Sequence, residues 1–166
     1  NTAVGYASLG ANTTGTANVA LGALALDANT TASYSTAIGT SALTANTTGA
    51  QNTVVGSSAG ASITTGSYNV AMGVDTLATA TTADYNTAIG KGALTANTTG
   101  TGNVALGANA ADAFDVGSWN TAIGHTALGA DTKGSHSVAV GYGALTLQNF
   151  TSATNTFNTA IGNNAL

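Results

Sequence analysis

The chain has 166 residues, of which only 5% are charged, and its net charge is −4. It contains no cysteine, which excludes disulfides and thiolate metal sites. Lys91 and Lys133 are its only Lys or Arg residues, so a basic surface for nucleic acid or anionic lipid is missing.

A repeat of 17 residues organises the sequence. Glycines preceded by an aliphatic residue recur at this interval from Gly5 to Gly141, and Gly162 follows 21 residues later. The difference predicts a four-residue insertion near residues 148–157. Helical-pair repeats need about 33 to 47 residues and propeller blades about 40. We therefore expect residues 1–166 to be a single all-β repeat array, a parallel β-roll (single-stranded β-solenoid) of about nine coils.

Each repeat predicts two strands and two corners. The first strand is the N-[TV]-A-[VILM] run, as in residues 18–21, because β-branched and aliphatic residues favour extended backbone. A second strand is expected around the "AL" pairs. Glycine and the "NTTG" segments predict corners, because Asn and Gly tolerate positive φ. Coils paired in register about 4.8 Å apart would place each side chain above its counterpart.

Such stacking predicts columns of like side chains along a rod. Two aliphatic columns are expected to form a thin core. They comprise Val4, Leu21, Ile38, Val55, Met72, Ile89, Leu106, Ile123, Val140 and Ile161, and Leu9, Leu26, Leu43, Leu77, Leu94, Leu128, Leu145 and Leu166. An alanine column, in which only Val54 is larger, predicts close backbone approach in a narrow interior or at a subunit contact.

Asparagines before the first strand predict a structural ladder of side-chain amides. The ladder residues are Asn18, Asn52, Asn69, Asn86, Asn103 and Asn120. Just before them, a variable column carries large rings, which could be buried between subunits or could bind a glycan by stacking. This candidate stripe comprises Tyr34, Tyr68, Tyr85, Trp119, His136 and Phe157. Segments 109–119 and 147–157 depart from the repeat and are further candidates for receptor contact.

The sequence predicts no enzyme, cofactor or metal site. It has no Glu, and Asp112 and Asp115 are read as solvated turn residues. His125 and His136 occupy different repeat positions and lack a partner at ligand spacing. No G-x-S-x-G motif occurs.

The repeat unit "NTAIGxxALxANTTGxx" resembles the head repeats of YadA-like trimeric autotransporter adhesins, with their N-[ST]-[VA]-A-[IV]-G strand, and similar arrays in phage tail fibres. The resemblance covers essentially the whole chain. It implies a left-handed β-roll, a homotrimer, and attachment to a host-surface glycan or protein receptor. It also implies an extracellular location, on a bacterial cell surface or a virion. The strict 17-residue period and the "NTTG" corner are closer to the tail-fibre type.

We expect the chain to be a fragment of a longer fibre protein that does not itself insert into a membrane, since it has no long apolar run. An ice-binding solenoid is the alternative function, suggested by two threonine columns. These are Thr13, Thr30, Thr47, Thr64, Thr81, Thr98 and Thr132, and Thr14, Thr31, Thr48, Thr65, Thr82 and Thr99. Adjacent strand residues point to opposite faces, so both columns cannot share one surface if they lie on a strand.

Overall fold

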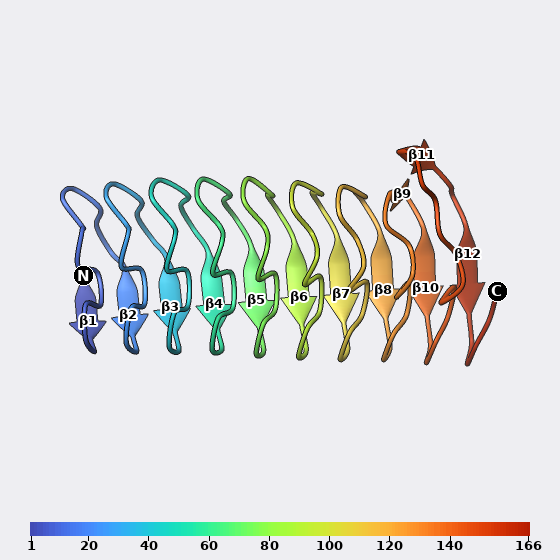
Figure 1. Cartoon of the computed structure of the whole chain (residues 1–166), viewed down its shortest axis with the longest axis horizontal. Coiled ribbons are helices and arrows are strands. Elements are labelled where there is room, and N and C mark those ends of the chain that lie inside the picture. Colours follow the sequence, from blue (N-terminus) through green and yellow to red (C-terminus); the bar gives the residue numbers. More distant parts are fainter.

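The computed structural model describes all residues 1–166 and shows a parallel β-solenoid without helices. Successive coils stack along one axis, and their strands form a ten-stranded parallel sheet that runs the length of the rod (Figure 1). Neighbouring strands pair in register at the 17-residue spacing, as where Ala88 lies opposite Ala105. The prediction of an all-β solenoid with 17-residue coils is confirmed.

The strands are short because one side of a thin coil has room for only a few residues. Those of the large sheet are β1 (Thr2–Val4), β2 (Val19–Leu21), β3 (Thr36–Ile38), β4 (Thr53–Val55), β5 (Val70–Met72), β6 (Thr87–Ile89), β7 (Val104–Leu106), β8 (Thr121–Ile123), β10 (Val138–Val140) and β12 (Thr159–Ile161). Two further strands, β9 (Gly134–Ser135) and β11 (Thr154–Asn155), pair with each other near the C-terminal end.

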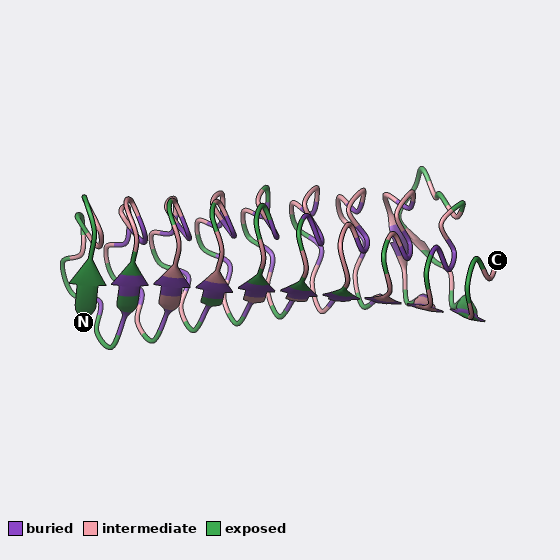
Figure 2. Cartoon of the chain, turned by 90° about the horizontal axis from the view of Figure 1, so that it is seen from below, coloured by how far each residue is buried: buried purple, intermediate pink, exposed green.

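In the ten-stranded sheet, the middle residue of each strand after β1 is buried, whereas the residues on either side of it are exposed or half-buried (Figure 2). From β2 onward the middle residue is alanine, or Val54 in β4, and is buried. The aliphatic residue that follows points outward, and Leu106, for example, is 43% exposed. The prediction that this aliphatic column belongs to the core is therefore wrong. Side chains alternate along a strand, and the coil is so thin that the alanine is the one that fits inside.

The "AL" pairs do not form a strand, so the prediction of a second strand in each coil is wrong. They lie in a ribbon of turns, in which Ala25 and Leu26 are both fully buried. Adjacent residues of an extended strand cannot both point inward. Leu26 instead adopts a left-handed backbone with φ of 52°, and its N–H donates to the carbonyl of Ala42 in the next coil at 3.0 Å.

The core therefore consists of the strand alanines packed against the alanines and leucines of the turn ribbon. The predicted leucine column contributes the buried Leu26, Leu43, Leu77, Leu94, Leu128 and Leu145. Its two end members differ, since Leu9 is only partly buried and Leu166 is exposed.

The glycine after each strand is required by the close stacking of coils. Gly90 has φ of 132°, and a Cβ placed on it would lie 2.5 Å from the carbonyl oxygen of Gly107 in the next coil. Any side chain here would both strain the backbone and push the coils apart. The repeating glycine thus marks a contact between neighbouring backbones.

The C-terminal coil contains the one large departure from the repeat. Between Gln148 and Phe157 the chain leaves the common path and projects beyond the row of corners, where β11 pairs with β9 (Figure 1). We call residues 149–156 the inserted loop. Buried Asp131 anchors its start, because its carboxylate accepts hydrogen bonds from Gln148 Nε2 at 2.6 Å and from the Phe150 N–H at 3.2 Å.

Candidate interaction surfaces

The asparagine column before the strands is an internal ladder. Asn86 Oδ1 accepts a hydrogen bond from the backbone N–H of Asn103 at 2.9 Å, and Asn86 Nδ2 donates to the Gly100 carbonyl at 2.9 Å. The ladder residues are buried, so their amides join coils and do not face a ligand. The main link is the hydrogen bond that each side-chain oxygen accepts from the backbone N–H of the ladder residue in the next coil. Some ladder residues also make a direct bond between their side-chain amides, as from Asn86 Nδ2 to Asn69 Oδ1 at 3.3 Å.

A second buried ladder was not predicted, because the asparagines of "NTTG" were interpreted only as corner residues. Asn46 Nδ2 donates to Asn29 Oδ1 at 3.3 Å and to the Gly49 carbonyl at 2.9 Å. The Oδ1 atoms of Asn46 and Asn97 are buried without a hydrogen-bond partner. The equivalent residues of the following coils are Ile63 and Phe114, whose side chains cannot donate.

The outward side of the ten-stranded sheet is an uncharged surface, which we call the outer sheet face. Its two columns are Thr2, Val19, Thr36, Thr53, Val70, Thr87, Val104, Thr121, Val138 and Thr159, and the aliphatic column from Val4 to Ile161 described above. All of these residues are exposed or half-buried. No other part of the chain forms a layer over them, so large aliphatic side chains face solvent along the whole rod.

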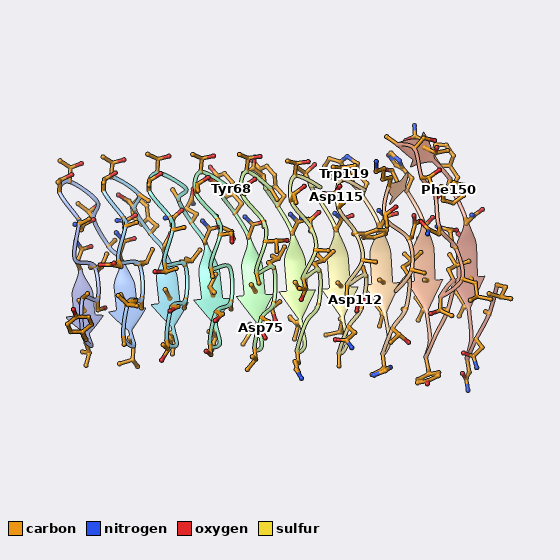
Figure 3. The ribbon with its side chains drawn as sticks, viewed as in Figure 1. Tyr68, Asp75, Asp112, Asp115, Trp119 and Phe150 are labelled. Atoms are coloured by element: carbon orange, nitrogen blue, oxygen red, sulfur yellow. The ribbon has the colours of Figure 1, made fainter.

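The candidate aromatic stripe lies just before the strands and is exposed in the single chain. Tyr68 and Tyr85 stack with ring centroids 4.8 Å apart, and His136 and Phe157 lie 5.2 Å apart in a tilted arrangement. Figure 3 places Tyr68, Trp119 and Phe150 at the same long edge of the rod, where the strands begin. The stripe therefore runs along one border of the outer sheet face.

The two threonine columns differ in their hydrogen bonding. In the first column, hydroxyls donate to carbonyls of the next coil, as from Thr47 Oγ1 to Thr64 at 3.1 Å. The second column, represented by Thr48, is exposed and its hydroxyls make no hydrogen bond within the chain. Only one row of threonine hydroxyls at this corner is thus fully free.

The ionisable residues are dispersed along the rod. No three His or Asp side chains lie close enough to hold a metal ion, and the surface has no pocket. Asp115 Oδ1 accepts a hydrogen bond from Thr98 at 2.6 Å. Asp112 lies at the opposite edge of the rod (Figure 3), where partial burial raises its pKa. The structure brings neither carboxylate next to a second acid that could act with it.

No protein family, curated protein or solved structure that we compared with the chain matches it. The chain forms no helix with the length and apolar character that a membrane span requires. The fold and its surfaces define it as a β-solenoid repeat protein.

Proposed function

We propose that this chain is a structural and adhesive segment of an extracellular homotrimeric fibre, without enzymatic activity, that mediates attachment to a host or another surface. The outer sheet face is the observation that carries the proposal. It is long, uncharged and regular, and nothing in the chain covers it. Large exposed apolar surfaces usually mark sites of association.

Association through this face would become stronger with every coil. Covering the exposed half of one aliphatic side chain contributes on the order of 1 kcal/mol. Because each coil adds one such side chain and one threonine or valine, a rod of many coils would gain a large apolar interface. The number three comes from the resemblance to trimeric fibre repeats, and the experiment below distinguishes it from two.

The remaining features agree with a role in attachment. A stack of coils joined by ladders and by backbone pairing is a rigid spacer. Its corners tolerate different side chains and an inserted loop without disturbing the sheet. Variable side chains on a rigid support are suited to contact with a receptor.

Substitution of Ile89 by lysine tests the interface. We expect the chain to have three times its monomer mass by light scattering, with the sedimentation of an elongated particle. Ile89→Lys should retain the circular dichroism of the rod, since the side chain points outward, but should sediment as a monomer, because burying an unpaired charge is costly.

Thr82→Lys is the matched control, because it adds the same charge at an exposed corner position that Lys133 occupies in a later coil. This variant should remain trimeric. A stable monomer or dimer of the unmodified chain, or an Ile89→Lys variant that still assembles, would contradict the proposed interface.

Ice binding is supported less well. It would need a flat array of free hydroxyls, whereas the structure engages one of the two corner threonine columns in hydrogen bonds between coils. Thermal hysteresis at millimolar protein would favour this alternative over the fibre.

A further inference from the structure

We propose that one corner of the rod, formed by Trp119, His136, Phe157 and the inserted loop, binds a neutral saccharide. We call this region the loop corner. The inference rests on the proposed attachment function and names the class of ligand that this function would use.

The fold does not require aromatic side chains at this position. Trp119 and Phe157 have φ of 59° and 52°, and Ala17 and Gly102 adopt the same left-handed backbone in other coils. A left-handed backbone costs most residues about 1–2 kcal/mol relative to glycine. Because Ala17 and Gly102 complete their coils without a ring, the large exposed rings exceed what the fold needs, which favours a role in contact with a partner.

Contact with Gly102 of the preceding coil holds the Trp119 ring in a defined orientation. A Cβ on Gly102 would collide with the six-membered ring of the indole, so the ring rests against the backbone of the preceding coil. The Trp119 side chain nevertheless remains 58% exposed. A ring fixed in this way loses little conformational entropy when a ligand binds.

The inserted loop supplies polar groups next to the segment that leads into His136. Asn149, Thr151, Ser152 and Asn155 are exposed and carry hydroxyl or amide groups. Pairing of β11 with β9 attaches the loop to the segment that leads directly into His136. A saccharide presents C–H groups on its ring faces and hydroxyls at its rim, so it can use both aromatic contact and these polar groups.

Charge favours an uncharged ligand. The charged residues of this corner are Asp115, Asp131 and Lys133, and Asp131 is buried with its carboxylate engaged by the inserted loop. Asp115 and Lys133 balance each other in sign. The loop corner thus offers no excess of positive charge to attract an acidic polysaccharide, and no acidic cluster to attract a basic peptide.

Trp119 is the only tryptophan of the chain, so its fluorescence reports on this corner alone. The probes are neutral gluco-, manno- and galacto-oligosaccharides, with a sialylated oligosaccharide as the charged comparison. We expect at least one neutral probe to shift the emission to shorter wavelength and to protect it from acrylamide quenching, with saturation. The sialylated probe should bind more weakly.

Trp119→Ala should fold, because Ala17 occupies the same position in another coil. In affinity electrophoresis through the corresponding neutral polysaccharide, we expect its binding to be at least about tenfold weaker. Tyr34→Ala is the matched control, since Tyr34 has the same backbone conformation and exposure but lies far from the inserted loop. It should bind like the unmodified chain.

The outcomes of these experiments distinguish a failure of the saccharide site from a failure of the proposed fibre. A trimer whose emission responds to none of the neutral probes would overturn the saccharide site and leave the fibre intact. A monomer that binds a neutral probe through Trp119 would support the site and contradict the fibre. Equal losses for Trp119→Ala and Tyr34→Ala would show that the loop corner is not the location of binding.

Discussion

Asn86 illustrates how a single polar side chain joins three successive coils. Its backbone N–H and its Nδ2 both donate to Asn69 Oδ1 in the preceding coil, and its own Oδ1 accepts from Asn103 in the following one. Because the ladder is buried, no water can replace these partners. The asparagine is therefore a structural residue of the rod.

Replacing this side chain should lower stability in proportion to the bonds lost. Asn86→Ala leaves the Asn103 N–H buried without an acceptor, and we expect the free energy of unfolding to fall by about 2–3 kcal/mol. Asn86→Ser should cost less, since Ser35 Oγ accepts the equivalent bond from Asn52 at 3.3 Å. Urea unfolding at one fixed protein concentration measures both. Equal losses for the two variants would show that the accepted bond is unimportant.

At this scale, the sequence indicates which residues are alike but not which way they point. The strands alternate, so either the alanine or the aliphatic residue had to face inward. Hydrophobicity favoured the aliphatic column, and that choice was wrong. The better signal was size, because the alanine column admits only Val54 as a larger member and a thin interior tolerates little variation in volume.

At the scale of one coil, the interior can be filled by a large side chain at either of two positions. In the commonest arrangement, as at Leu43 and Asn46, a leucine fills the core and an asparagine follows three residues later. In the coil of residues 52–68 these are Gly60 and Ile63, and in a later coil they are Ala111 and Phe114. The larger side chain has moved to the second position, which leaves the preceding asparagine Oδ1 without a donor.

This exchange predicts coupling between Gly60 and Ile63. Gly60→Leu alone should destabilise the chain by about 1–3 kcal/mol, because a Cβ at residue 60 would already lie 3.1 Å from Ile63 Cδ1. Adding Ile63→Asn restores the common pair of residues and should recover much of that loss. A double-mutant cycle by urea unfolding measures the coupling, and additive effects of the two substitutions would contradict it.

The turn ribbon explains why one element could not be predicted. Consecutive "AL" residues were interpreted as part of a strand, yet both are buried, which requires left-handed residues in the backbone. Leucine rarely adopts positive φ, so local propensity gave no sign of it. Hydrogen bonds to neighbouring coils stabilise this conformation, and they exist only after the coils have stacked.

At the scale of the molecule, the period alone determined the register. In the regular coils, the strand pairs and the links from asparagine to asparagine connect residues 17 apart, so the spacing in the sequence becomes the spacing of these contacts. The path of the inserted loop could not be predicted in the same way, because its residues have no counterpart in other coils.

Removal of one repeat tests this dependence on register. Deletion of residues 18–34 joins Ala17 to Ser35 and keeps every ladder in phase, so we expect a folded and slightly less stable rod. Deletion of residues 18–33 removes nearly the same mass but shifts the phase by one, which exchanges inward and outward side chains in part of the rod. Circular dichroism and thermal unfolding should show loss of cooperative structure only for the second deletion. Similar behaviour of both would mean that register is not decisive.

The direction of the bonds between coils also determines how the rod responds to force. Because the coils stack along the axis, a pull on its two ends loads their contacts in series, and the terminal coil can peel away while the others stay folded. Each released coil would add roughly 55–60 Å of extended chain. A fibre built in this way lengthens in equal steps under load. A sudden increase in force at one end is therefore transmitted only gradually to the other end.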